Sequence, residues 1–303
     1  MNKAMQVCVL CLLACLSACD RRPAAKVGRR TIVVTYAVLG SITRELAGDD
    51  FEVRTLIPNG LDIHEWEPSA RDIEALTRAD LVVENGLGLE GGLGKALDQA
   101  RKAGVPFFTA SDYIRVRIVG AGEGLPTGDP DQAPGARDPH LWTDPLAVKA
   151  VAGALAGDIQ RRFGRDLSAR NRELGTRLDA LDLEIRKTVD ALPVERRKLV
   201  TGHESLGYFA QRYGFTLVGA VIPGMSTEGA GSAASMARLK RLIREQGVTA
   251  IFTEVGTSPR TVEALARETQ VRALPLATHT LPADGSYLSF GRELANTILG
   301  GLQ

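Results

Sequence analysis

Two hydrophobic patterns alternate along most of the chain. Short apolar runs rich in β-branched residues are typical of buried parallel strands, and segments whose apolar residues recur every three or four positions are typical of helices. In the first half the predicted strands are residues 31–40, 51–57, 80–86 and 106–110. The predicted helices between them are residues 41–48, with Ser41 as N-cap, 69–79 and 91–104. This alternation predicts a parallel sheet covered by helices on both faces.

A long helix is predicted in the middle of the chain. Pro193 ends it, and its apolar stripe consists of Leu174, Leu178, Leu181, Ile185, Val189 and Leu192. At 1.5 Å per residue it would be roughly 40 Å long. The strand and helix pattern restarts after it and closes with a helix over residues 286–302. We therefore predict an α/β fold of two pseudo-symmetric lobes, each a parallel-rich sheet flanked by helices, joined by one long helix. The lobes are residues 31–165 and 194–303, and residues 166–193 connect them.

The N-terminus carries all four cysteines, at positions 8, 11, 15 and 19. The uncharged apolar stretch from Val7 to Leu16 is too short to span a membrane and has the length of a signal-peptide core, so residues 1–18 are predicted to be a signal peptide. The ending "LSAC" resembles a bacterial lipobox, which implies cleavage before Cys19 and its lipidation. A simple secretory signal cut nearby is the alternative. Residues 19–30 then form a tether, and the mature protein is exported and anchored to the membrane.

Charge and aromatic content narrow the range of partners. The chain has 37 basic and 36 acidic residues and only 5% aromatic residues. It therefore has neither the basic surface nor the stacking side chains of a nucleic-acid-binding protein. We expect no nucleic-acid partner and a monomer. The Gly- and Pro-rich residues 119–137 are predicted to be a mobile surface loop without a site.

Four histidines carry the candidate chemistry. His64, His203 and His279 follow predicted strands, and His140 follows the long loop. Ligands of open α/β sheets bind beyond the carboxyl ends of the strands, so these are expected site positions. A single histidine there is commonly structural, but four at such positions favour a metal site. Neutral imidazole binds zinc, copper and nickel, and four nitrogens suit a tetrahedral ion.

Motifs around these histidines carry a family resemblance over nearly the whole mature chain. "GLDIHEWEP", "DPHLWTDP", "TGHESLGYFAQRYGF" and "LATHTLPADGSYL" occur in order. They resemble the cluster 9 (A-I) metal-binding lipoproteins of bacterial zinc and manganese ABC importers. The resemblance implies that His64, His140 and His203 bind the metal. At the third of these positions histidine goes with zinc-type members and glutamate with many manganese-type ones. The family has aspartate at the fourth position, where this chain has His279.

The ligand set predicts the metal. Hard Mn²⁺ prefers oxygen donors, so an all-nitrogen set favours Zn²⁺, with manganese, cobalt, nickel and copper as alternatives. Four neutral imidazoles leave the ion's charge uncompensated, and nearby carboxylates are expected to accept the free ring N–H groups. The candidates are Asp62, Asp138, Glu204 and Glu254, of which Glu254 is favoured. Glu254 is also an alternative fourth ligand if His279 turns away.

The predicted function is binding rather than catalysis. The protein captures Zn²⁺ outside the cytoplasmic membrane, as transported cargo, and delivers it to an ABC permease and its ATPase. A metal-binding surface adhesin without transport is the alternative. A zinc hydrolase is disfavoured because catalytic zinc keeps an open coordination position, which four ligands would fill.

Overall fold

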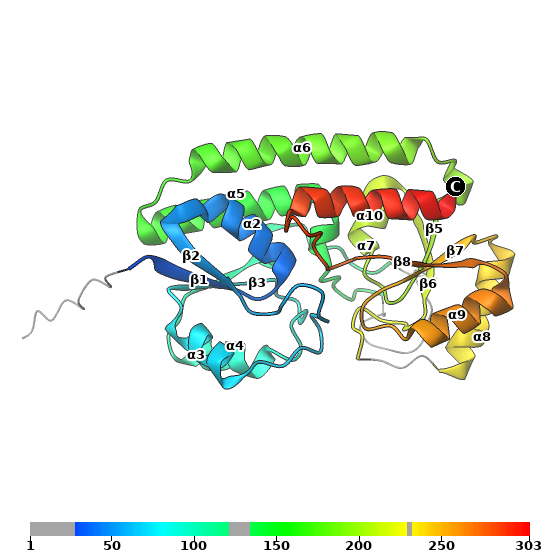
Figure 1. Cartoon of the computed structure of the whole chain (residues 1–303), viewed down its shortest axis with the longest axis horizontal. Coiled ribbons are helices and arrows are strands. Elements are labelled where there is room, and N and C mark those ends of the chain that lie inside the picture. The colour runs from blue at the N-terminus through cyan, green and yellow to red at the C-terminus, as the bar shows by residue number, and fades with distance from the viewer. Residues whose placement is uncertain (1–27, 121–133, 229–231) are drawn as a thin grey trace, which may run out of the picture.

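The computed structural model describes residues 28–120, 134–228 and 232–303. The predicted signal peptide, the lipidation site at Cys19, most of the tether and most of the 119–137 loop lie outside these residues. Figure 1 shows two α/β lobes side by side, with long helices lying across them. Within the described residues, no helix combines the length and the apolar character that a membrane span requires.

The first lobe is built on a parallel four-stranded sheet of order β2-β1-β3-β4. Its central strand β1 pairs with both neighbours, so that Ile32 lies opposite Val53 and Leu81. The strands are β1 (Arg30–Val34), β2 (Phe51–Thr55), β3 (Leu81–Glu84) and β4 (Phe107–Thr109). The helices between them are α2 (Ala37–Ala47), α3 (Ala70–Arg78) and α4 (Gly94–Lys102). Residues buried on both strand faces, such as those of β3, fit a sheet covered on both sides.

The second lobe contains two pairs of parallel strands, β5-β6 and β7-β8, with β5 beside β7. The strands are β5 (Lys198–Thr201), β6 (Thr216–Ala220), β7 (Ala250–Thr253) and β8 (Arg272–Pro275). Its helices are α7 (Gly207–Tyr213), α8 (Ala233–Glu245) and α9 (Pro259–Thr269). The predicted two-lobed α/β class, with parallel strands flanked by helices, is confirmed.

Three long helices pack together: α5 (Pro145–Phe163), the connecting helix α6 (Ser168–Asp190) and α10 (Tyr287–Leu302). Helix α6 packs along α5, α10 and α2 (Figure 1). The stripe of leucines predicted from the sequence is its buried face, and these residues belong to one hydrophobic core that extends through both lobes. A second, smaller core lies between β6, β7, α8 and α9. One face of the connecting helix therefore belongs to the main hydrophobic core.

One local prediction was wrong. The strand predicted over 31–40 ends at Val34, and α2 begins at Ala37, so Ser41 lies inside the helix instead of capping it. The first turns of α2 are buried from Ala37 to Thr43, so the apolar run continues from strand into helix without a polar break. Hydrophobic periodicity cannot separate a strand from a fully buried helix. Ser41 Oγ donates instead to the carbonyl of Gly285, at the start of the segment that leads into α10.

A glycine allows α10 to approach α6. A Cβ atom at Gly291 would lie 2.9 Å from Leu181 Cδ2, and Leu181 is fully buried. Gly300, on the same helix, has no atom within 4 Å of the corresponding position. The two glycines therefore differ in packing but share a helical backbone.

We expect Gly291→Val to lower the free energy of unfolding by about 1–3 kcal/mol, because the added methyl groups overpack the α6–α10 contact. Gly300→Ala is the matched control and should raise it by up to about 1 kcal/mol, through helix propensity alone. Urea unfolding of the two variants measures both effects. Equal stabilities would contradict this account of the helix contact.

Glu90 is a buried carboxyl at the carboxyl edge of the first sheet. It is 5% exposed, and its Oε1 accepts hydrogen bonds from Thr35 Oγ1 at 2.8 Å and from the N–H of Asn85 at 2.7 Å. Burial raises its pKa to about 7 despite these hydrogen bonds, and the nearby charge of Glu84 acts in the same direction. The folded protein therefore keeps a proton on Glu90 at pH values where the unfolded chain has lost it.

The contribution of Glu90 to the stability of the metal-free protein is expected to fall as pH rises from about 4.5 to 7. The folded state binds the extra proton in this window, which makes the loss about 3 kcal/mol. Glu90→Gln keeps the acceptor oxygen and removes the titration, so this part of the pH dependence should disappear. Urea unfolding at pH 5 and pH 8 with chelator present tests it, with the exposed Glu67→Gln as control. An unchanged pH dependence in Glu90→Gln would refute the assignment.

Candidate metal site

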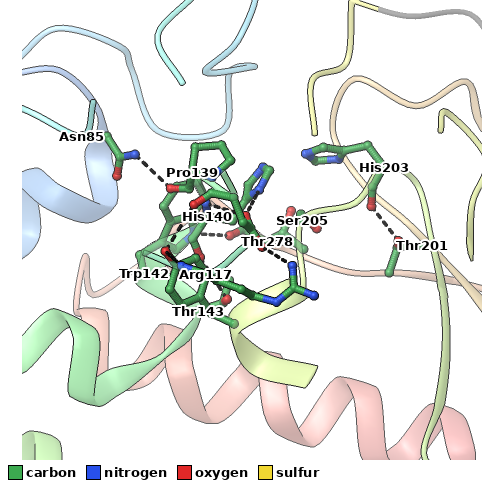
Figure 2. Close-up of polar contacts among 12 residues, drawn as sticks. Asn85, Arg117, Pro139, His140, Trp142, Thr143, Thr201, His203, Ser205 and Thr278 are labelled. Carbon is green, nitrogen blue, oxygen red and sulfur yellow. Dashed lines mark hydrogen bonds and ion pairs between the residues drawn. The ribbon is translucent and has the colours of Figure 1, made fainter. Parts of the chain in front are cut away.

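Three histidines from both lobes meet at one buried point. His64 lies in the loop after β2, His140 directly precedes a short 3₁₀ turn (Leu141–Thr143), and His203 is two residues beyond β5. The three residues are 2%, 0% and 0% exposed, and one nitrogen of each lies within 4.8 Å of the others. Figure 2 shows His140 and His203 approaching each other from separate segments, with ring centroids 5.2 Å apart. This spacing suits three ligands of one ion.

The ring nitrogens that face this point lack partners. Among the described residues, the Nε2 atoms of His64, His140, His203 and His279 are all buried without a hydrogen bond. An unpaired buried polar atom costs about 1–3 kcal/mol, and native proteins pair nearly all such atoms. Four of them on neighbouring residues are typical of a site that binds a cation through nitrogen lone pairs.

Local turns fix two of the histidines in the same way. Asp62 Oδ1 accepts the backbone N–H of His64 at 2.9 Å, and Asp138 Oδ1 accepts that of His140 at 2.9 Å. Each Asp-x-His segment thus forms an aspartate-stabilised turn. The His64 loop also packs closely on Gly92, whose N–H donates to the carbonyl of His64. A Cβ atom at Gly92 would lie 2.3 Å from the carbonyl oxygen of Trp66, so a larger residue would displace the loop.

Three of the four predicted carboxylates take different positions at the site. Asp138 Oδ1 lies 2.9 Å from His140 Nδ1, and Glu254 Oε2 lies 3.2 Å from His203 Nδ1. Glu254 also accepts from the N–H of Gly202 and the hydroxyls of Ser205 and Thr278. Asp62, by contrast, contacts the main chain of His64, and its other oxygen accepts from Thr227 Oγ1. Asp138 therefore orients the ring of His140 through a hydrogen bond, Glu254 places a negative charge beside the ring of His203, and Asp62 shapes the loop.

His279 lies beside the other three but not among them. It is 2% exposed, and its ring centroid is 6.5 Å from that of His203. It does not belong to the group of three whose nitrogens lie within 4.8 Å. Its segment is tied to the first lobe, because Trp142 Nε1 donates to the carbonyl of Thr278 and Asn59 forms two hydrogen bonds with the main chain of Leu281. The main chain around His279 is therefore fixed, and its imidazole lies outside the group formed by the other three.

Burial keeps most of these imidazoles neutral. It lowers the pKa of His64 well below its ordinary value, lowers that of His140 against the opposing effect of Asp138, and lowers that of His279 to about 4. Burial also acts to lower the pKa of His203, but the carboxylate of Glu254 outweighs it and raises the pKa. A neutral imidazole has the free lone pair that a metal requires. His64, His140 and His279 therefore offer free lone pairs near neutral pH, whereas a metal must compete with a proton at His203.

Sequence reasoning missed two residues that support the His140 loop. Asn85, directly after β3, donates to the carbonyl of Pro139 at 2.9 Å (Figure 2). Arg117 Nη1 lies 3.1 Å from Asp138 Oδ2. Asn85 could have been found, because it is a polar residue at the end of a buried strand. Arg117 gave no signal, because it lies in an irregular segment and its partner is 21 residues away.

Comparisons with known proteins agree with this geometry. A family model described as zinc-uptake complex component A, periplasmic, matches residues 32–301. The zinc-binding protein TroA of Treponema pallidum is 31% identical over 284 residues, covering 92% of this chain and 83% of TroA. The manganese ABC transporter substrate-binding lipoprotein PsaA of Streptococcus mitis is 27% identical over 273 residues, covering 87% of this chain and 84% of PsaA.

Solved structures agree as well. The periplasmic zinc-binding protein TroA of Treponema pallidum superposes with a TM-score of 0.77 at 26% identity, covering 91% of this chain and 99% of that one. The matched region of the family model begins in β1 and ends in α10, and so includes both lobes, the connecting helix and all four histidines. The chain belongs to the zinc-uptake complex component A family.

Proposed function

We propose that this protein captures a divalent transition metal, zinc in the first place, outside the cytoplasmic membrane and delivers it to an ABC permease and its ATPase. One observation carries the proposal: the four buried Nε2 atoms that lack a partner. His64, His140 and His203 form the inner ligand set, and His279 completes it when the cation draws its ring inward. The family is one of solute-binding proteins rather than enzymes, which fits a site built to hold an ion.

The donor chemistry supports zinc over manganese. Four imidazoles offer only nitrogen, which suits Zn²⁺ in tetrahedral geometry, whereas Mn²⁺ prefers oxygen ligands. The relatives include a zinc-binding protein and a manganese lipoprotein, so the choice of metal depends on this chain's own ligands. Asp138 and Glu254 contribute negative charge next to His140 and His203, which offsets the charge of the ion. Glu254 is occupied by Gly202, Ser205 and Thr278, which favours His279 as the fourth ligand.

The proposal also covers the location of the protein in the cell and its division into domains. Residues 1–18 act as a signal peptide, and a lipid on Cys19 anchors a monomer through the tether of residues 19–30. The metal lies between lobes of residues 31–165 and 194–303, connected by residues 166–193. The relative PsaA is a lipoprotein by name, which supports the anchor. Mass spectrometry of the mature protein from a lipoprotein-processing host would detect the acylated Cys19.

Metal titration of the chelator-treated protein tests the ligand set. Wild type is expected to bind Zn²⁺ tighter than micromolar. His64→Ala should weaken binding by more than the ~10–100-fold that loss of a ligand's orienting partner costs, because it removes a ligand itself. Glu65→Ala, at the exposed neighbouring position, is the matched control and should bind as wild type does. Wild-type affinity in His64→Ala, or the absence of tight binding to any divalent metal, would refute the function.

His279→Asp restores the residue type that the family resemblance implies at this position. We expect it to retain zinc binding and to raise Mn²⁺ affinity about 10-fold, roughly 1.4 kcal/mol, because a carboxylate adds a hard, charged donor. Competitive titration with both metals measures the change, and His279→Ala provides the comparison without a fourth donor. If His279→Asp binds neither metal, aspartate does not substitute for histidine here and the expectation is wrong; unchanged zinc affinity in His279→Ala would show that His279 is not a ligand.

A further inference from the structure

Arg117 lies beside the metal site in a segment that no helix or strand fixes. It follows the 3₁₀ turn Ala110–Tyr113 and pairs with the segment that leads into His140. The carbonyl of Arg117 accepts the N–H of Asp138 at 3.0 Å, and Val119 N donates to the carbonyl of Ala136 at 2.9 Å. The side chain of Arg117 is 8% exposed. Main-chain hydrogen bonds therefore fix the position of Arg117, and its side chain is buried.

Asp138 divides its two carboxylate oxygens between different partners. Oδ1 accepts from His140, through both the backbone N–H and Nδ1 at 2.9 Å, and Oδ2 lies 3.1 Å from Arg117 Nη1. Tyr208 connects the two residues again, because its hydroxyl accepts from Arg117 N at 2.9 Å and donates to the carbonyl of Asp138 at 3.2 Å. Every polar group of Asp138 has a partner, and three of these contacts lead to Arg117 or Tyr208.

The start of α7 closes around this pair. A Cβ atom at Gly207 would lie 2.0 Å from Asp138 Oδ2 and 2.5 Å from Arg117 Nη1. Helix α7 follows the His203 loop, so the second lobe packs directly against the ion pair of the first. Glu254, which plays the corresponding part for His203, accepts from a backbone N–H and two hydroxyls. The carboxylates beside the two histidines are thus held differently: Asp138 by the cation of Arg117, and Glu254 by neutral donors.

We propose that Arg117 is a positioning residue for metal binding: it holds Asp138 so that Oδ1 keeps the proton of His140 on Nδ1 and the Nε2 lone pair faces the ion. The proposal rests on the function proposed above. A carboxylate that bonds the outer nitrogen of an imidazole ligand fixes its tautomer and orientation. Asp138 is fully buried, and without Arg117 its second oxygen would lose its charged partner, which is strongly unfavourable inside a protein. The carboxylate would then turn to new partners, and His140 would lose its fixed orientation.

A double-mutant cycle separates this role from general destabilisation. Zn²⁺ affinity is measured by chelator competition for wild type, Arg117→Met, Asp138→Asn and the double variant. We expect Arg117→Met to weaken binding by about 10-fold or more, within the range for partners of metal ligands. The double variant should bind no more weakly than Asp138→Asn alone, because Arg117 acts through Asp138. Arg117→Lys keeps the charge and one donor and should recover part of the loss.

Two further measurements keep the test specific. The visible spectrum of the Co²⁺-loaded protein reports ligand geometry, and it should change in Arg117→Met but not in Arg115→Met, a control at an exposed arginine two residues earlier. Thermal unfolding verifies that each variant folds. If Arg117→Met does not fold, Arg117→Lys, Asp138→Asn and their double variant provide the same cycle.

The outcomes are distinct. Unchanged zinc affinity in Arg117→Met, losses that add to that of Asp138→Asn, or tighter binding from removal of a nearby positive charge would each overturn the positioning role. Wild-type protein that fails to bind zinc would instead refute the proposed function, independently of Arg117.

Discussion

The structure depends on keeping four imidazole nitrogens buried and unpaired at one place. Each such atom costs about 1–3 kcal/mol while it lacks a partner, so the surrounding fold must compensate for it. The compensating interactions are made by the outer ring nitrogens and by the loops that carry the histidines. Asp138 hydrogen-bonds the outer nitrogen of His140, Glu254 lies 3.2 Å from that of His203, and short turns fix the main chain of His64 and His140. In the proposed function, a metal ion would remove this cost by supplying the missing partner of each nitrogen.

Neither lobe can form this site alone. His64 and His140 come from the first lobe and His203 from the second, while the His279 segment leaves β8 but is tied to Trp142 and Asn59 of the first. The residues that support the histidines also form hydrogen bonds between the lobes: Asp62 with Thr227, and Asp138 with Tyr208. Affinity for the ion is therefore linked to the relative position of the lobes. A change in that position would alter several ligands together.

The sequence predicted the fold class and the candidate ligands for a common reason. Both depend on short-range patterns: β-branched runs, helical apolar stripes, and polar residues just beyond strand ends. Parallel strands bring such residues together without further information, as with His203 after β5. The prediction of Ser41 as a cap failed because the buried start of α2 offers no polar face to mark it. Arg117 could not be found because its role depends on a pairing with Asp138, 21 residues further along the chain, which no local pattern encodes.

The shared core limits how the ion can be released. Helix α6 packs into the main hydrophobic cluster with α5 and α10, and Asp182 on it accepts from Arg212 and Tyr213 of α7. Arg212 also contacts Asp144, the residue that caps α5 directly after the His140 turn. A rigid rotation of one lobe against the other would have to separate these buried contacts together. The smaller core under α8 and α9 is separate from the main one, and its loops contact the site through Thr227 and Gly256, which lie against Asp62. Movement confined to that part would shift the contacts of Asp62, and with them the His64 loop, while leaving the main core intact, so we expect it to cost less free energy than separating the lobes as whole bodies.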